Sequence, residues 1–345
     1  TGAGKTIITA ALCQLVEPYG RTLTIVPNKS LVTQTEEDFL ACNLDTGVYY
    51  GDRKEIGRYN TIATWQSLNV LEKRSKDEHS TEFKEAMQGI NTVIIDEVHM
   101  AKADVLKRML TGPFAHCGIR WGLTGTVPKA DYEFMGIKCA IGDVINKIPA
   151  KELQEKGVLA NCNVNIVQTV ETKMFSNYQE ELKWLTTDDR RMSWIAKTID
   201  SISTTGNTLI LVDRISAGEM LEKKLPGSVF ISGSTKNPDR KEHYDEVSTA
   251  KNKIIIATYG VASVGINIPR IFNLVLIEPG KSFVRVIQSI GRGIRKAEDK
   301  DHVEIWDLTS SCKFAKRHLT QRKKFYKEAN YPYNIEKINY ENSFT

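Results

Sequence analysis

Residues 91–97 read NTVIIDE, in which an apolar run at 93–95 is followed by two carboxylates. Runs of this kind are typical of strands buried on both faces of a parallel sheet. Amphipathic stretches lie between many comparable runs, and alternating strands and helices predict parallel sheets covered by helices, that is, an α/β fold. The comparable runs occupy residues 22–27, 60–65, 120–126, 207–214, 228–234, 252–259, 272–278 and 302–308.

The domain organisation follows from length and from one change in composition. A chain of 345 residues predicts about two domains. A proline and a short charged stretch follow Lys147, which favours a boundary near residues 150–165. We therefore expect a first domain over residues 1–150, a second over 151–310, and a basic helical tail over 311–345. The charged stretch 72–88 is expected to form a solvated loop with a short helix.

The composition excludes several kinds of protein. Hydrophobic residues make up 41% of the chain and charged residues 26%, as in ordinary soluble globular proteins. The net charge of +5 is compatible with a polyanionic partner but does not establish one. The six cysteines are too scattered for a C-x-x-C metal or redox site, and no apolar run reaches the ~18 residues that span a membrane. We expect reduced thiols, a cytoplasmic location and no membrane partner.

The first six residues, TGAGKT, match the end of the phosphate-binding pattern G-x-x-x-x-G-K-[ST] without its first glycine. In such a loop the glycines let backbone N–H groups approach phosphate oxygens, the lysine reaches the β and γ phosphates, and the hydroxyl can ligate Mg²⁺. Because the loop normally follows a strand, we expect an N-terminally truncated fragment. The candidate ATP-binding residues are Gly2, Ala3, Gly4, Lys5 and Thr6.

Asp96 and Glu97 end the run 91–97 and supply the second half of a nucleotide site. A strand-end aspartate is suited to hold Mg²⁺, usually through water, and the next carboxylate to position or deprotonate the attacking water. Two carboxylates at a buried strand end are costly without a cation, which Mg²⁺ and Lys5 would supply. The alternative is a helix N-cap with an acidic first turn. Thr6 and Asp96 are thus the candidate metal ligands.

These motifs resemble the superfamily-two DExH-box helicases, and the likeness covers most of the chain. Asp96-Glu97-Val98-His99 is the box itself. The sequence WDLTSS followed by a basic helix and PYNIEKINY resembles phage UvsW-type DNA helicases in particular. One departure is Asn267, which stands where many relatives carry an acidic residue. The other motifs, in the family's order, are TIVPNKSLVTQ from Thr24, TIATWQSL from Thr61, LTGT from Leu123, LILVDR from Leu209, ATYGVASVGINIP from Ala257 and QSIGRGIR from Gln288.

The resemblance implies two tandem RecA-like domains with an ATP cleft between them. It implies that Arg292 and Arg295 act as arginine fingers, that Gln288 belongs to the catalytic set, and that Gly265 lies at the nucleotide. The physical argument for the arginines is independent, since a transferring phosphoryl group needs cations and a guanidinium presents a planar fork of donors. A plain basic turn is the alternative for this segment.

The same resemblance divides other polar residues between coupling and nucleic-acid contact. It assigns coupling to His99, Thr124 and Thr126. Hydroxyls and backbone N–H groups near the nucleic acid would contact phosphates, which gives grip without reading sequence. Each such residue could instead cap a helix or a turn. The candidate nucleic-acid contacts are Pro27, Thr64, Gln66 and Thr258.

Residues 313–327 carry basic side chains and interleaved aromatics, with no acidic residue. A basic stretch with aromatics can follow a phosphate backbone and stack on bases. It can equally be a helix that packs its aromatics on the second domain and leaves a solvated basic face. Both interpretations stay open, and the candidate contacts are Lys316, Arg317 and Lys323.

The function expected from these motifs is an ATP- and Mg²⁺-dependent DNA helicase or translocase. Its expected partner is DNA, most simply branched or forked DNA, with RNA–DNA hybrids as a further substrate. A DExH RNA helicase and a non-unwinding DNA translocase, such as a restriction-enzyme motor subunit, are the alternatives. A P-loop phosphotransferase or a switch GTPase is disfavoured, because one nucleotide site would not need a second α/β half with Arg292 and Arg295.

Overall fold

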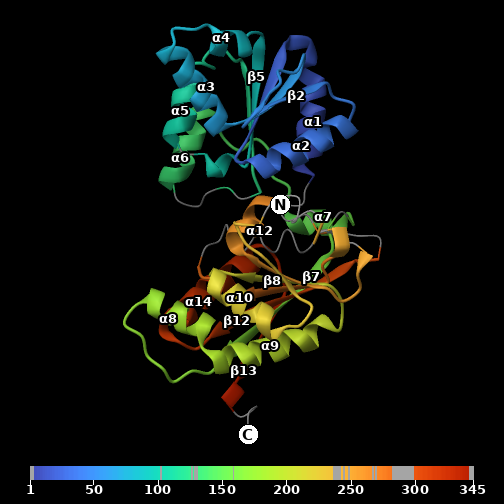
Figure 1. Ribbon diagram of the computed structural model, residues 1–345, viewed down its shortest axis with the longest axis vertical. Helices are drawn as coiled ribbons and strands as arrows, with labels where there is room; N and C mark the ends of the chain where they lie inside the picture. Colours follow the sequence, from blue (N-terminus) through green and yellow to red (C-terminus); the bar gives the residue numbers. More distant parts are fainter. Residues whose placement is uncertain are drawn as a thin grey trace. The chain divides into compact units, whose positions relative to one another are not determined.

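The computed structural model describes residues 4–101, 103–125, 127, 131–157, 159–235, 242–243, 245–247, 249–265, 268, 270–281 and 299–341. These residues fall into two compact units, one that ends at Lys147 and one that begins at Ile148. Each unit is a sheet flanked by helices (Figure 1). No described helix is both long and apolar enough to cross a membrane.

The sheet of the first unit has the strand order β3-β2-β4-β1-β5-β6. All neighbours are parallel except the two-residue edge strand β3, which runs antiparallel to β2. The parallel register brings Val26, the last residue of β1, beside Thr64, the last residue of β4. The strands are β1 (Arg21–Val26), β2 (Thr46–Tyr50), β3 (Arg53–Lys54), β4 (Asn60–Thr64), β5 (Ile90–Asp96) and β6 (Ile119–Leu123).

Helices cover both faces of this sheet because alternate strand residues point to opposite sides. Leu23 and Ile25 of β1 pack with α3, α5 and α6, whereas Val26 packs with α1 and α2. Figure 1 shows these two groups of helices on opposite sides of the strands. The helices are α1 (Lys5–Val16), α2 (Lys29–Ala41), α3 (Trp65–Asp77), α4 (Glu82–Ala86), α5 (Ala103–Thr111) and α6 (Asp131–Ala140), with the 3₁₀ turns η1 (Glu17–Tyr19) and η2 (Val98–Met100).

The sheet of the second unit is entirely parallel, in the order β13-β7-β12-β11-β8-β10-β9. Its inner strands β8, β10 and β11 are almost wholly buried, which agrees with their unbroken apolar sequences. The strands are β7 (Asn161–Thr169), β8 (Thr208–Val212), β9 (Val229–Ile231), β10 (Ile254–Thr258), β11 (Asn273–Ile277), β12 (His302–Ser310) and β13 (Tyr333–Ile338).

One face of this sheet packs against α9 and α10, through Ile210, Ile256 and Val275 among others. The last helix, α14, contacts β12 and α8, so the basic C-terminal segment is built into the unit. The helices are α7 (Ala150–Glu155), α8 (Tyr178–Thr187), α9 (Asp189–Ser203), α10 (Ile215–Lys224), α12 (Tyr259–Gly265) and α14 (Lys313–Glu328).

The apolar runs predicted as strands are all strands, and the α/β class is confirmed. Two differences have clear causes. Residues 311–345 contain the strand β13 besides the expected helix. Apolar and polar residues do not alternate regularly along β13, so the sequence does not predict this strand, and its pairing with β7 fixes it. Within the stretch 72–88, α3 continues to Asp77, because Glu72 is buried and receives bonds from both Lys76 and Arg108.

Candidate nucleotide and nucleic-acid site

The predicted site residues of the first unit gather at one edge of its sheet. The parallel strands β1, β4, β5 and β6 end side by side, so their carboxyl ends lie at the same edge. Pro27 follows β1, Thr64 ends β4, Asp96 ends β5, and Thr124 follows β6. Ligands of open α/β sheets bind outside this edge.

Lys5 and the two carboxylates meet although the sequence separates them widely. Lys5 is the first residue of α1 and follows Gly4, whose φ of 68° is left-handed and suits glycine. Its Nζ hydrogen-bonds Glu97 Oε1 and lies 3.7 Å from Asp96 Oδ1. Asp96 Oδ1 also accepts the backbone N–H of Glu97 at 2.9 Å. A cation and two acceptor-only groups are therefore fixed at the start of a helix, where the backbone also favours anions.

The two carboxyl groups have different proton affinities because their neighbours differ. Burial raises the pKa of Asp96, and the charge on Glu97 raises it further, against the opposing effect of Lys5. Burial also acts to raise the pKa of Glu97, but its direct contact with Lys5 outweighs burial and holds that pKa below its usual value. Glu97 is thus an ionised acceptor at neutral pH, as a group that orients water must be.

The geometry around Glu97 fits a site that takes up a further polar group. Its backbone is left-handed, with φ 47° and ψ 47°, which is uncommon outside glycine and clusters at functional sites. Its Oε2 atom is buried and has no hydrogen-bond partner among the described residues. No group of three or more acidic, histidine or cysteine side chains in the described ranges is arranged to hold a metal by itself.

His99 links the carboxylates to the end of the neighbouring strand. It lies in η2, and its Nδ1 is 2.6 Å from the Oγ1 of Thr124 and 3.4 Å from Glu97 Oε2. Burial lowers the pKa of His99, with the charge of Glu97 opposing. A neutral imidazole can therefore connect the position of Glu97 to the loop after β6, which is the kind of contact that the coupling prediction requires.

The other predicted nucleic-acid contacts have mixed surroundings. The Thr64 hydroxyl caps α3: it accepts the Ser67 N–H at 3.3 Å and donates to Ser67 Oγ at 3.0 Å. The Thr258 hydroxyl accepts the Val261 N–H at 3.4 Å, at the start of the helix that ends at Gly265. Pro27 is half-buried and Gln66 is exposed. Capping occupies the two threonines, so their contact with nucleic acid stays a prediction.

Several predicted residues lie outside the described ranges of the structure. They come from the phosphate loop, from the loop after β6 and from the segment after β11. They are Gly2, Ala3, Thr126, Gln288, Arg292 and Arg295.

Helix α14 has two chemically distinct faces. Its inner face buries Ala315, His318, Leu319, Arg322 and Tyr326. Its aromatics pack within the unit, as when Phe314 contacts Tyr178 of α8 with ring centroids 6.4 Å apart. Of the predicted contacts Lys316 and Arg317 are exposed and Lys323 is half-buried. The exposed basic side chains recur at helical spacing and form a stripe, Lys313, Lys316, Arg317, Lys324 and Lys327.

Sequence reasoning missed a buried charge cluster in the second unit. Arg322 and Asp307 are both fully buried, and two parallel bonds of 2.8 Å join them. Arg191 is also fully buried and lies 2.9 Å from Glu278. The sequence signal was Asp307, a charged residue inside the apolar run 302–308, because a buried charge needs a partner.

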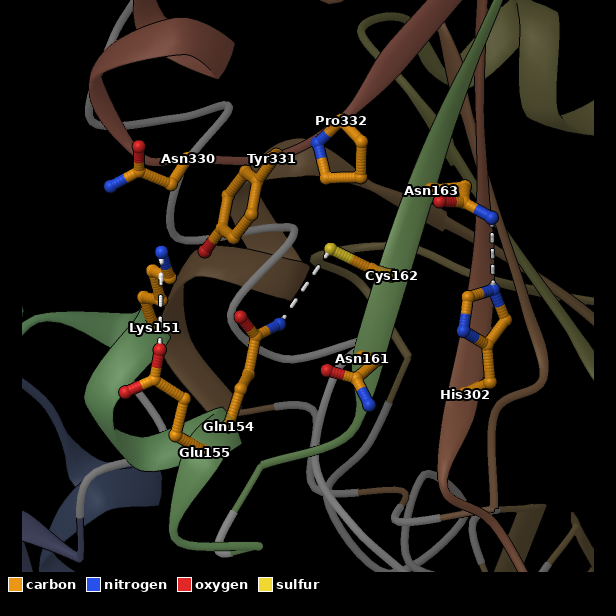
Figure 2. Close-up of a pocket in the computed structure, with 10 residues that line it drawn as sticks. All are labelled: Lys151, Gln154, Glu155, Asn161, Cys162, Asn163, His302, Asn330, Tyr331 and Pro332. Atoms are coloured by element: carbon orange, nitrogen blue, oxygen red, sulfur yellow. Dashed lines mark hydrogen bonds and ion pairs between the residues drawn. The ribbon is translucent and has the colours of Figure 1, made fainter.

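A polar pocket of about 560 Å³ lies at the amino-terminal ends of β7 and β12 in the second sheet (Figure 2). Its side chains bond one another: Asn163 Nδ2 lies 3.4 Å from His302 Nε2, and Gln154 donates to the Cys162 sulfur at 3.9 Å (Figure 2). His302 also contacts Glu304 at 2.8 Å. These polar groups of the pocket are thus engaged with one another.

Comparisons with known proteins find similar family models and similar helicases. Two family models match, one described as type III restriction enzyme, res subunit, over residues 1–129, and one as helicase conserved C-terminal domain, over residues 190–297. The ATP-dependent DNA helicase UvsW of Enterobacteria phage T4 is 26% identical over 347 residues, covering 94% of this chain and 67% of that protein. The transcription and DNA repair factor IIH helicase/translocase subunit XPB/SSL2 of Saccharomyces cerevisiae is 24% identical over 362 residues, covering 97% of this chain.

The chain spans about two thirds of the phage protein and 41% of the yeast subunit. Among solved structures, S. cerevisiae Dbp5 bound to RNA and ADP BeF3 superposes with a TM-score of 0.65 at 15% identity, covering 100% of this chain and 85% of that one. An identity this low speaks for the fold alone, and the fold is a pair of RecA-like units in tandem.

Proposed function

We propose that this chain, a member of the superfamily-two DExH-box helicases, couples ATP hydrolysis to unwinding or branch migration of DNA. The observation that carries the proposal is the meeting of Lys5, Asp96 and Glu97 at the carboxyl edge of the first sheet. A phosphate-binding lysine beside a metal-binding and a water-orienting carboxylate is the minimal set for hydrolysing a nucleoside triphosphate.

The chain's own groups would divide the work as follows. Gly4, Lys5 and Thr6 would hold the phosphates, and the Lys5 ammonium would leave Glu97 for the phosphate oxygens. Glu97 would then be free to accept a proton from, or orient, the attacking water. Asp96 and Thr6 would hold Mg²⁺, which when bound neutralises charge on the phosphate oxygens. The raised pKa of Asp96 would fall beside such a cation.

Arg292 and Arg295 of the second unit would balance the negative charge that develops on the transferring phosphoryl group. Their support is chemical and comes from the matched segment, since residues 190–297 fit the helicase C-terminal family model. If a guanidinium reaches the nucleotide in only one domain arrangement, hydrolysis depends on that arrangement. A cycle of ATP binding and hydrolysis can then drive movement along a nucleic acid. Gln288 belongs to the same segment, and Gly265 ends the helix α12 of the preceding motif.

The nucleic-acid partner is supported by two separate features. The stripe on α14 presents basic side chains on one exposed face, suited to successive phosphates. Both curated relatives reported above carry names that link them to DNA. DNA, branched or forked, is therefore the proposed substrate class. An RNA helicase and a non-unwinding translocase are the alternative functions, the latter favoured by the restriction-enzyme family model.

The test measures ATPase activity of the chain alone and with single-stranded DNA, duplex DNA, forked DNA or RNA. We expect forked DNA to give the largest rise in kcat and Lys5→Ala to abolish it. A rise with RNA alone would support an RNA helicase. A rise with duplex DNA and no strand separation would support a translocase. A wild-type chain that binds ATP but shows no rise with any nucleic acid would contradict the motor function.

A further inference from the structure

The turn after β11 has an unusual backbone. Glu278 has a φ of 41° and Gly280 a φ of 73°, so two of three consecutive residues are left-handed, with Pro279 between them. A non-glycine residue in this region costs about 1–3 kcal/mol and persists only where its surroundings fix it. The turn is followed along the chain by residues 282–298, which contain the predicted arginine fingers Arg292 and Arg295.

Four elements fix this turn through buried polar contacts. The Tyr259 hydroxyl of α12 donates to the Ile277 carbonyl at 3.2 Å, and the Thr309 hydroxyl of β12 donates to Glu278 Oε2 at 3.2 Å. Arg191 of α9 donates to Glu278 Oε1 at 2.9 Å. The fourth contact comes from α14, whose Arg322 donates to the Gly280 carbonyl at 2.7 Å. The strained backbone is thus determined from several sides at once.

Arg322 connects the turn to the interior of α14. Its Nε and Nη2 bond both oxygens of Asp307, which leaves Nη1 to reach Gly280. The Tyr326 hydroxyl, one turn further along α14, donates to Asp307 Oδ2 at 2.7 Å. The Asp307 carboxylate therefore holds the guanidinium plane in one orientation. A lysine in place of Arg322 could not bond both Asp307 and the Gly280 carbonyl in this way.

Stability alone does not account for so many buried charges. Replacing a buried ion pair by apolar residues of similar volume is often neutral or stabilising, so the pair is weak evidence of a stabilising role. The opposite face of the same helix carries the exposed basic stripe, Lys313, Lys316, Arg317, Lys324 and Lys327. Helix α14 thus carries the exposed basic stripe on one face and, on the other, the arginine that bonds the strained turn.

We propose that Arg322 is a positioning residue for ATP turnover: it ties the turn Glu278–Gly280 to α14, so that nucleic acid on the basic stripe raises kcat through this turn. The inference rests on the proposed nucleic-acid-dependent ATPase function. It assigns a role to a residue that is fully buried within the second unit. It also predicts that the effect falls on kcat rather than on the affinity for either ligand.

The test removes the buried cluster without leaving an unpaired charge. In the triple variant Asp307→Leu, Arg322→Met, Tyr326→Phe, we expect the unfolding midpoint and the affinities for a fluorescent ATP analogue and for forked DNA to stay near wild type. We expect kcat at saturating forked DNA to fall about 10-fold or more, the scale of a small misplacement of reacting groups, with KM unchanged. Arg53→Met, which removes a half-buried arginine from a similar bidentate pair with Glu36, is the matched control and should leave kcat unchanged.

A second variant keeps the inference testable if the triple variant does not fold. Arg322→Lys retains the charge beside Asp307 but not the fork, and we expect the same loss in DNA-stimulated kcat. Wild-type stimulation in whichever of the two variants folds would overturn the inference. A wild-type chain with no stimulation by any nucleic acid would instead overturn the proposed function, and this inference with it.

Discussion

The Nζ of Lys5 hydrogen-bonds the Oε1 of Glu97 across 92 positions of sequence. The contact pairs a half-buried cation with one oxygen of a half-buried carboxylate, and both are groups that a bound nucleotide would need. The pair must open for Lys5 to reach phosphate. We therefore expect Lys5 to contribute to ATP binding, and Glu97 to contribute mainly to catalysis.

The first prediction concerns that pair. Lys5→Ala should weaken binding of a fluorescent ATP analogue and lower kcat by at least ~10²-fold, since a cation is lost where negative charge develops. Glu97→Gln should keep analogue binding within a few-fold while kcat falls by ~10²–10⁴, the usual contribution of a general base. Titration of the analogue and steady-state ATPase assays check both. Equal loss of binding in the two variants would contradict the separation.

The second prediction concerns the contact between His99 Nδ1 and Thr124 Oγ1, 2.6 Å apart. Thr124→Val keeps the shape and removes the hydroxyl, so ATP affinity should be unchanged while the nucleic-acid-stimulated rate falls by up to ~10-fold, the worth of one hydrogen bond. Thr187→Val is the control, because that exposed hydroxyl only bonds a carbonyl within its own helix. A fall in the unstimulated rate alone would argue against a coupling role.

The third prediction concerns Arg292, in the segment that matches the helicase C-terminal family model. Arg292→Ala should lower kcat by ~10³-fold or more with the fold and ATP affinity retained, as expected for an arginine finger. Arg292→Lys should restore little, because an ammonium lacks the planar fork. Full ATPase activity in Arg292→Ala would refute the finger assignment, and circular dichroism checks that each variant is folded.

The fourth prediction concerns the basic stripe. The double variant Lys316→Ala, Arg317→Ala should weaken DNA binding and make the slope of log affinity against log salt shallower by about 1.8, since each lost phosphate contact contributes ~0.9. Fluorescence anisotropy over a range of salt concentrations measures the slope. The exposed Lys223 and Lys337 lie elsewhere on the unit, and their double alanine variant should keep the wild-type slope. An unchanged slope in both doubles would remove α14 from the interface.

The fifth prediction uses the titration of Glu278. Burial raises its pKa to about 7 despite Arg191 and Arg322, so the folded chain holds a proton that the unfolded chain releases near its ordinary value of 4.5. The folded state therefore binds more protons in this window, and stability falls as pH rises from about 4.5 to about 7, then levels off. The contribution is on the order of 3 kcal/mol.

Glu278→Gln should remove this dependence. Urea unfolding at about pH 5 and about pH 7.5 should show the variant gaining stability relative to wild type at the higher pH. Glu155→Gln, at an exposed position, should follow the wild-type curve at both values. A variant that loses relative stability on going to the higher pH would show that Arg191 holds Glu278 ionised instead.

The sequence by itself determined the α/β class, because strands buried on both faces have apolar cores, as at 93–95 and 274–277. It also predicted the chemistry of the candidate nucleotide site, because few residue types can cradle phosphate, hold Mg²⁺ and orient water. Tertiary structure decided what spacing cannot carry: that Thr64 is taken up by capping, that β13 completes the second sheet, and that Arg322 faces inward beside Asp307. The physical reason is that a charge run looks alike whether a side chain meets water or a buried carboxylate, and only the packing of α14 on β12 distinguishes the two.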